Sequence, residues 1–369
     1  DLLFRLTMPK TSRVTSQRKP RYRVRAVDLF CGAGGLTHGL IKAGVDVTAG
    51  VDCVESCQYA YTYNNRAVYL QRDVRDVHAS DLTRYLKKKR PDGDLTLLAG
   101  CAPCQTFSSY NRKADSSDPR WNLLGEFLRL VEETKPDLVT MENVPELATK
   151  DVFLTFVSGL KRLGYADPSW KVVRCEDYGL PQHRRRLVLL ASRFGPVQIL
   201  NPEQFGARPS TVREAIGFLP KVDAGAVDEN DSLHRSFSLN DLNLRRIRAS
   251  KPGGTWRDWP EELRCLCHKK ESGSSYQSVY GRMSWDQPSP TMTTQFLNYG
   301  TGRFGHPEQD RALTLREGAI LQSFPHNYQF VAPGEKILMT HVARMIGNAV
   351  PVVIGELIGR SIFKHLNSL

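Results

Sequence analysis

The sequence predicts an α/β fold, with a doubly wound, mostly parallel sheet and a second, smaller domain that is irregular or β-rich. From Arg25 onward, short apolar runs alternate with amphipathic stretches, which is the pattern of repeated strand–helix units. After about Phe194 this alternation stops, and the stretch from Gly195 to roughly Tyr280 is rich in Pro, Gly, Ser, Arg and Trp. Apolar residues make up 40% of the 369 residues, which is enough for a sizeable buried core.

The apolar runs and the helical patterns give the expected elements in chain order. The expected strands are Ala26–Phe30, Val47–Val51, Leu95–Ala99, Leu138–Met141, Val172–Arg174 and Leu187–Ala191. The expected helices are Leu123–Glu133, Val152–Leu163, Val212–Phe218, Leu315–Ser323 and Val352–Lys364. In an open parallel sheet, ligands bind beyond the carboxyl ends of the strands, so the residues that follow each strand are the candidates for a site.

The charge of the chain favours a polyanionic partner. A formal net charge of +12 lets a protein gain affinity for nucleic acid by releasing condensed counterions, although a merely soluble basic protein has the same composition. Part of the excess lies in residues 1–23, which have no apolar period and are expected to form a flexible basic tail. No apolar run approaches the roughly 20 residues that span a membrane, and the first residues lack the apolar core of a secretory signal. We therefore expect a cytoplasmic protein with reduced cysteines and no membrane partner.

A glycine-rich turn follows the first expected strand and indicates a ligand site. Asp28 opens the run Asp-Leu-Phe-Cys-Gly-Ala-Gly-Gly, in which glycines let the backbone turn tightly and approach a ligand. The spacing is not that of a dinucleotide motif, because Thr37 stands where the last glycine would be. Asp52 ends the second strand and Asp73 follows soon after, and carboxylates there suit ribose hydroxyls. The set predicts a nucleotide-like cofactor, and a purely structural turn remains the alternative.

A Pro-Cys step after the strand Leu95–Ala99 gives a candidate nucleophile. Cys104 follows Pro103 on a rigid turn, where a thiolate is a good nucleophile if nearby cations lower its pKa. A redox pair with Cys101 and a buried structural thiol remain open. The sequence has no second C-x-x-C pair, and Cys265-x-Cys267-His268 is badly spaced for a zinc ribbon, so no metal is expected.

Further candidates follow the later strands. Glu142 ends the strand Leu138–Met141 and can exchange a proton with a ring nitrogen, or it can cap the next helix. The run Arg184–Arg186 can clamp a phosphate or a base carbonyl, or it can form a solvated strand edge. A Gly-Asn turn at Asn348 precedes the last expected helix and is commonplace in itself.

Taken together and in this order, these blocks resemble the cytosine C5 DNA methyltransferase family. The match runs from about Val24 to Phe194 and again from about Tyr280 to the C-terminus. The resemblance implies a class I, Rossmann-like methyltransferase fold with S-adenosylmethionine as cofactor. It also implies a catalytic domain at 24–194, a target-recognition domain at 195–330 and a helical segment at 331–369 that returns to the catalytic domain.

The resemblance assigns roles to the residues of each block. Phe30 lies against the adenine, Asp52 binds the ribose and Asp73 binds the adenine amino group. Many members place a bulky residue over the adenine where this sequence has Cys53, so the resemblance implies weaker stacking on the adenine here. The implied cofactor set is Asp28, Phe30, Gly32, Gly34, Gly35, Asp52, Cys53, Asp73, Pro103, Asn348 and Val350. The implied catalytic set is Cys104, Glu142, Arg184 and Arg186.

The implied reaction begins with addition of Cys104 to C6 of a cytosine that has been flipped out of the duplex. Glu142 holds N3 and its proton, Arg186 holds the exocyclic carbonyl, and C5 then accepts the methyl group. The polar loop Ser108–Arg120 is a candidate for closing over the base, or it is a plain surface loop. Bidentate arginines in the middle stretch can read guanine or fix phosphates. The implied DNA-binding set is Gln105, Ser108, Arg112, Arg120, Arg245, Arg246, Arg257 and Arg282.

Other functions on the same residues remain open. An RNA cytosine methyltransferase shares the scaffold, but the Cys-Phe-Thr segment typical of that branch is not found here. A catalytically silent DNA-binding relative is the next alternative, although Cys104 and Glu142 are both present. A nicotinamide or thiol-redox enzyme leaves the arginine run and the Gly-Asn block unexplained. We expect a monomer that acts on double-stranded DNA, and by family analogy a cognate restriction endonuclease for the same site.

Overall fold

A seven-stranded mixed sheet forms the centre of the catalytic part of the chain. The computed structural model describes residues 22–88, 93–103, 123–270 and 278–369. The strand order is β3-β2-β1-β4-β5-β7-β6. The strands are β1 (Arg23–Leu29), β2 (Asp46–Asp52), β3 (Val68–Gln71), β4 (Asp94–Gly100), β5 (Leu138–Asn143), β6 (Ala166–Arg174) and β7 (Arg185–Ser192). The first five are parallel, whereas β7 runs antiparallel to both β5 and β6.

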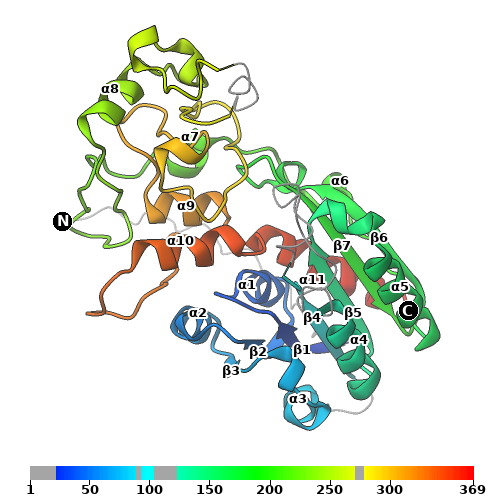
Figure 1. Cartoon of the computed structure of the whole chain (residues 1–369). Helices are drawn as coiled ribbons and strands as arrows, with labels where there is room; N and C mark the ends of the chain where they lie inside the picture. Colours follow the sequence, from blue (N-terminus) through cyan, green and yellow to red (C-terminus); the bar gives the residue numbers. More distant parts are fainter. Residues whose placement is uncertain (1–21, 89–92, 104–122, 271–277) are drawn as a thin grey trace, which may run out of the picture.

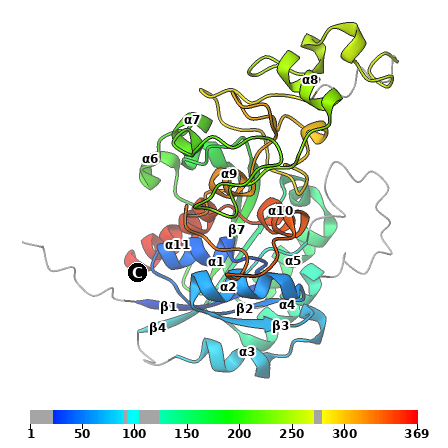
Figure 2. The ribbon, with the colours of Figure 1, turned by 90° about the vertical axis from the view of Figure 1, so that its left-hand side faces the viewer.

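Helices cover both faces of this sheet. They are α1 (Gly35–Lys42), α2 (Gln58–Asn65), α3 (Ala79–Leu86), α4 (Leu123–Thr134), α5 (Asp151–Arg162), α10 (Met339–Asn348) and α11 (Val352–Asn367). Figure 1 and Figure 2 show α1 and α11 on one face and α3 on the other. The alternation along β1 explains the layers, because Val24 and Ala26 pack in the α1–α11 core while Val27 and Leu29 pack in the core with α3, α4 and α5.

All six expected strands are present, five of them with wider bounds and the first ending at Leu29 rather than Phe30, and the α/β prediction is confirmed. The sequence reasoning missed β3, which has only four residues and whose Val68 is exposed. It also missed α3, which carries an ordinary amphipathic pattern between two polar loops. The antiparallel β7 was not anticipated either, since the residue pattern of a buried strand does not reveal its direction.

The region after β7 is irregular, and the β-rich alternative was wrong for the residues that the structure describes. Residues 195–270 and 278–330 contain isolated β-bridges but no strand of the named set. Their helices are short: α6 (Pro202–Phe205), α7 (Val212–Ile216), α8 (Asp241–Ala249) and α9 (Leu315–Leu321). Figure 1 shows this region on one side of α10, which lies between it and the sheet. A shared core joins the parts, because Phe296 and Phe324 pack in one cluster with Tyr61 of α2 and Ile346 of α10.

A buried ion pair holds α9 in this region. Arg311 makes two hydrogen bonds of 2.7 Å to the Glu317 carboxylate, and both side chains are buried. Burial alone would raise the pKa of Glu317, but the Arg311 charge outweighs it and lowers the pKa to about 2. Since the folded-state pKa lies below the ordinary value for Glu, this pair stabilises the protein at neutral pH. The contribution is lost as the pH falls from the ordinary Glu range toward about 2.

Breaking this pair is expected to be costly. Glu317→Gln leaves the Arg311 guanidinium without a buried counter-charge, so we expect the unfolding free energy to fall by about 3–5 kcal/mol. Urea unfolding at neutral pH measures this change. Asp286→Asn is the matched control, because Asp286 pairs with Arg213 on the exposed surface and its loss should leave the midpoint nearly unchanged. Equal effects of the two substitutions would contradict the stabilising role of the buried pair.

One stretch of the described chain, 339–367, is long and apolar enough to cross a membrane by length and composition. It comprises α10 and α11, which are separate helices on either side of Pro351. Within its most apolar window, 72% of the residues are buried inside the protein. This stretch is therefore accounted for as core packing, as the contacts of α11 with α1 and the sheet also indicate.

Candidate active site

A cavity of about 460 Å³ lies at the carboxyl ends of the parallel strands. Its walls come from the segments that follow β1, β2 and β4, and from the junction between α10 and α11. In the strand order, β2 and β3 lie on one side of β1 while β4 and β5 lie on the other. The cavity is thus at the point where the chain reverses its direction of winding, which is where open α/β sheets bind their ligands.

Most of the predicted cofactor residues line this one cavity. They are Asp28, Phe30, Gly32, Gly35, Asp52, Cys53, Asp73, Pro103, Asn348 and Val350. Gly34 is the exception: it caps the N-terminus of α1 with a φ of 93°, and a Cβ there would meet Asn65 rather than the cavity. Its left-handed φ serves the start of the helix, and its contact with a cofactor stays a prediction.

The turn after β1 has a constrained backbone. Phe30 has a φ of 58°, a left-handed conformation that costs energy for a bulky residue and that is found mostly at functional sites. Gly35 begins α1 directly against the α10–α11 junction, where an added Cβ would lie 2.2 Å from the Val350 carbonyl oxygen. The two ends of the chain therefore meet at this glycine, and the contact explains why no side chain fits there.

Enlarging Gly35 is expected to damage both the fold and the cavity. Gly35→Ala should push the Val350 backbone away, lower the unfolding free energy by about 1–3 kcal/mol and weaken cofactor binding. Thermal unfolding and cofactor titration measure the two effects. Gly334→Ala is the control, because Gly334 has a φ of 84° but open space around its Cα, so backbone strain acts there without a clash. Wild-type cofactor affinity in Gly35→Ala would contradict this account.

Three carboxylates border the cavity. Asp28 accepts a 2.7 Å hydrogen bond from the Thr37 hydroxyl through Oδ2, whereas its buried Oδ1 has no partner. Burial raises the pKa of Asp28 to about 7, and the nearby Asp52 charge adds to the shift. Burial also raises the pKa of Asp52, although its oxygens accept backbone hydrogen bonds from Gly32 and Val54. In contrast, a hydrogen-bonded Arg75 lowers the pKa of Asp73.

The buried Glu142 and the partly buried Arg186 form an ion pair at the carboxyl end of β5. Arg186 Nε lies 2.8 Å from Glu142 Oε1, and the Glu142 side chain is 2% exposed. The antiparallel direction of β7 explains the pairing, because its first residues lie beside the last residues of β5, with Asn143 opposite Leu187. Two candidates 44 positions apart in the sequence are thereby brought into contact.

The turn that carries Cys104 is tied to the same carboxylate. Cys101 Sγ donates a 2.9 Å hydrogen bond to Glu142 Oε2, and Asn143 Nδ2 donates one of 2.9 Å to the Ala102 carbonyl. Pro103 lines the cavity. Cys104 itself lies outside the described residues, as do Gln105, Ser108, Arg112, Arg120 and the loop Ser108–Arg120. The described cysteines carry free thiols.

Arg184 is corrected from a catalytic to a structural residue. Its guanidinium is buried and donates to the Met292 carbonyl at 2.9 Å, to Gln182 Oε1 at 3.2 Å and to the Gly347 carbonyl at 3.4 Å. These bonds tie the region after β7 and the end of α10 to the sheet. These contacts use the guanidinium inside the protein and support a structural role for Arg184.

Two of the predicted DNA-binding arginines are also buried. Arg282 donates to the Ile247, His306 and Gln309 carbonyls and pairs with Asp310 at 2.7 Å. Arg246 donates to the Leu263 carbonyl, and its guanidinium lies near aromatic rings. Both hold the region together, so their assignment as DNA contacts is corrected. Arg245 and Arg257 are exposed.

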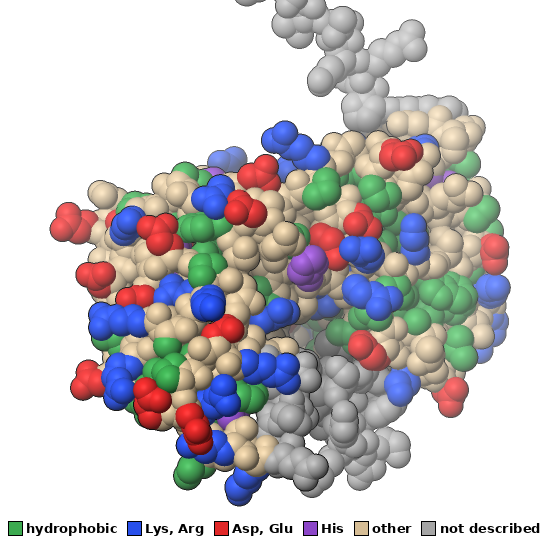
Figure 3. Space-filling model, turned by 90° about the horizontal axis from the view of Figure 1, so that it is seen from above, with side chains coloured by type: hydrophobic (Ala, Val, Ile, Leu, Met, Phe, Trp, Pro, Cys, Tyr) green, Lys and Arg blue, Asp and Glu red, His purple; other side chains and the backbone are tan. Residues whose placement is uncertain are grey.

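The sequence reasoning missed several residues of the cavity. Arg344 and His341 project from α10 beside Asn348, and both are exposed at the cavity mouth. His341, Arg344 and Asn348 follow one another at intervals of three and four residues, which places them on one face of the helix, and this spacing was an available signal. Figure 3 shows basic side chains around a central hollow of the face seen from above.

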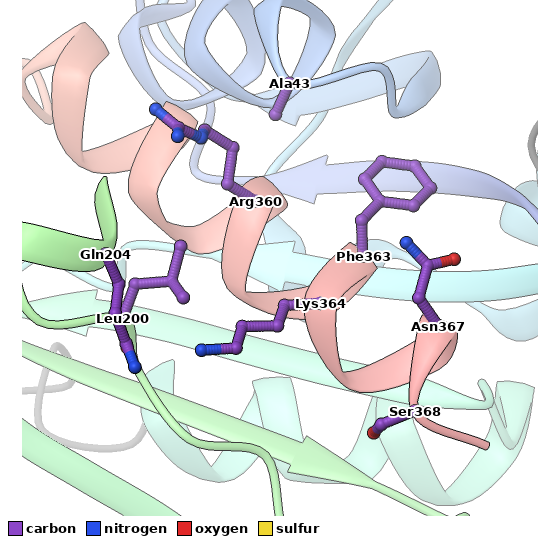
Figure 4. Close-up of a pocket in the computed structure, with 8 residues that line it drawn as sticks. All are labelled: Ala43, Leu200, Gln204, Arg360, Phe363, Lys364, Asn367 and Ser368. Carbon is purple, nitrogen blue, oxygen red and sulfur yellow. The ribbon is translucent and has the colours of Figure 1, made fainter. Parts of the chain in front are cut away.

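A second depression holds none of the predicted residues. It has a volume of about 650 Å³ and lies along the last turns of α11, beside Ala43 at the end of α1 (Figure 4). Because α1 runs back from the carboxyl end of β1, this depression lies toward the amino ends of the parallel strands. Arg360 and Lys364 border it, and Arg360 stacks over Phe205.

Comparison with known proteins agrees with this geometry. The model of the C-5 cytosine-specific DNA methylase family matches residues 24–364. The type II methylase M.HgiDII of Herpetosiphon aurantiacus is 51% identical over 93% of this chain and 96% of its own length. The type II methyltransferase M1.HphI of Haemophilus parahaemolyticus is 33% identical over 92% and 86%.

Solved structures share the fold. A protein described as a DNA modification methyltransferase encoded within an E. coli prophage superposes with a TM-score of 0.71 at 22% identity, over 94% of this chain and 99% of that one. The Entamoeba histolytica methyltransferase EhMeth gives a TM-score of 0.64 at 16% identity, over 93% and 99%. The chain thus belongs to the C-5 cytosine-specific DNA methylase family and is a DNA (cytosine-5-)-methyltransferase of the type II restriction–modification kind.

Proposed function

We propose that this methyltransferase acts through a covalent bond between Cys104 and C6 of a flipped-out cytosine. The observation that carries the proposal is the Glu142–Arg186 pair, in which Glu142 is buried and is tied to the Cys101–Pro103 turn directly before Cys104. Addition of a thiolate to C6 makes C5 nucleophilic, because the sulfur–C6 bond forms as the C5–C6 double bond breaks and its π electron pair moves to C5. The base must leave the duplex for this attack, since its edge is inaccessible in the stack.

The Glu142–Arg186 pair supports the addition of the thiolate by binding N3 and the exocyclic carbonyl of the cytosine ring. Glu142 holds N3 and its proton, and Arg186 binds the exocyclic carbonyl while keeping the Glu142 carboxylate in place. Cys101 holds the second carboxylate oxygen. After transfer, a base removes the C5 proton, the electron pair re-forms the C5–C6 double bond, and Cys104 leaves as a thiolate.

The family uses S-adenosylmethionine, and the cavity residues fit this cofactor. It supplies an electrophilic methyl group when bound. The partnerless Asp28 Oδ1 can accept from its ammonium group, Asp52 and Asp73 can accept from ribose hydroxyls and the adenine amino group, and Phe30 supplies an apolar wall. Arg344 lies where it can bind a carboxylate.

The raised pKa of Asp28 predicts a pH-dependent affinity for this cationic cofactor. Below about pH 7 the Asp28 carboxyl is protonated and loses its attraction for the ammonium group, so we expect affinity to fall by up to about tenfold per pH unit. Calorimetric titration between about pH 6 and pH 8 measures it. Asp28→Asn should flatten the profile. A wild-type affinity that stays constant across this range would contradict the role of Asp28.

Recognition of a DNA sequence is proposed to lie in residues 195–330. The exposed Arg245 and Arg257 support this proposal, since they are free to fix phosphates or read guanine. The division into a tail at 1–23, a catalytic domain at 24–194, this recognition domain and a returning segment at 331–369 stays a proposal. So do the monomeric state, the cytoplasmic location and a cognate endonuclease with the same site.

The test of the activity is transfer of a labelled methyl group to duplex DNA, with structured RNA as the control. Bisulfite sequencing of the product then gives the methylated cytosine and its sequence context. We expect labelling of DNA at one recurring sequence. Labelling of RNA alone would contradict the proposed substrate.

A further inference from the structure

Two thiols and an imidazole come together at the end of the region after β7. Cys265, Cys267 and His268 each present a ligand atom, and these three atoms lie within 4.8 Å of one another. A tight turn produces the cluster, because the His268 amide donates to the Cys265 carbonyl at 2.9 Å. The cluster is far along the chain from the catalytic residues, and the methyl-transfer mechanism makes no use of it.

The His268 imidazole is fixed by ring contacts, but one of its two nitrogen atoms has no hydrogen-bond partner. His268 is 8% exposed, and its Nδ1 is buried with no hydrogen-bond partner. The ring stacks on Trp256 at 4.2 Å between centroids and meets the edge of Tyr280. Because a buried nitrogen without a hydrogen-bond partner destabilises the folded state, an unpaired Nδ1 of this kind indicates a ligand.

The spacing of the three atoms suits a tetrahedral ion. Zinc bound to thiolates at about 2.3 Å holds two sulfur atoms about 3.8 Å apart, so the three groups need to close by at most about 1 Å.

We propose that Cys265, Cys267 and His268 bind a zinc ion, with a water molecule as the fourth ligand. A ligand set of two thiolates and an imidazole favours zinc over harder cations such as Mg²⁺ and Ca²⁺. The ion clamps a small core made of Ile247, Trp256, Trp259, Leu263, Tyr299 and Ala312. So few buried side chains give a folded segment limited stability of its own, and a structural metal supplies the remainder.

The test uses the full-length protein with Co²⁺ and Zn²⁺ as probes. Protein stripped with a chelator and reduced is titrated with Co²⁺, and we expect thiolate-to-cobalt charge-transfer absorption that saturates at one equivalent. Zn²⁺ should abolish this absorption by displacement. Cys265→Ser and Cys267→Ser should each weaken Co²⁺ binding by at least about tenfold, since each removes one ligand.

Two controls keep the result specific. Leu266→Ala lies between the two thiols and is 81% exposed, so it tests local disturbance with all ligands retained. Cys53→Ser removes an exposed thiol elsewhere. Both should bind Co²⁺ like the wild type. Absence of charge-transfer absorption in the wild type, equal absorption in the two ligand variants, or a Cys265–Cys267 disulfide in anaerobically purified protein would overturn the proposal.

Discussion

Replacement of Cys104 by serine is expected to reduce methyl transfer by more than about 10⁴-fold, because removal of a covalent nucleophile disables the whole reaction sequence. A serine hydroxyl is a weak nucleophile without an adjacent base, whereas a thiolate adds readily to an electron-poor ring. Labelled methyl transfer to duplex DNA under single-turnover conditions measures the loss.

Binding should survive this substitution. Cofactor titration and DNA gel-shift assays on Cys104→Ser serve as the control, and we expect both dissociation constants within a few-fold of the wild type. The cavity walls that the structure describes do not include Cys104, so cofactor affinity has no reason to change. A variant that retains more than a hundredth of the wild-type rate would contradict the role of Cys104.

Glu142→Gln is expected to lower the rate by about 10²–10⁴-fold, the usual contribution of a positioned acid or base. The amide cannot hold a proton for N3, and it leaves Arg186 without its buried counter-charge at 2.8 Å. Single-turnover methyl transfer again gives the rate. Glu146→Gln is the matched control on the next turn of the chain, where the side chain is exposed, and it should react like the wild type. A Glu142→Gln rate within tenfold of the wild type would contradict the proposal.

The strand positions were predictable because alternating apolar residues report burial on two faces, as along β1. The cavity residues were predictable because strand ends of a parallel sheet meet at one edge. In contrast, the burial of Arg184, Arg246 and Arg282 was not predictable. The sequence does not distinguish an arginine that donates to backbone carbonyl oxygens from one that binds phosphates.

Residue spacing also gave no sign of one side-chain cluster. Cys265, Cys267 and His268 do not match a zinc-ribbon spacing, yet a single tight turn gathers them within 4.8 Å. The Glu142–Arg186 contact depended on the reversed direction of β7, which no local pattern announces. Contacts that rest on chain direction or on one turn therefore need the structure.

The central claim is that Cys104, and not the neighbouring Cys101, forms the covalent bond to cytosine. The most direct measurement uses duplex DNA with 5-fluorocytosine at the methylated position, since fluorine at C5 blocks proton removal and traps the adduct. Mass spectrometry of the digested adduct then locates the modified residue. We predict a methylated fluorocytosine on Cys104 and no adduct in Cys104→Ser. An adduct on Cys101, or one that persists in the Cys104→Ser variant, would contradict the mechanism.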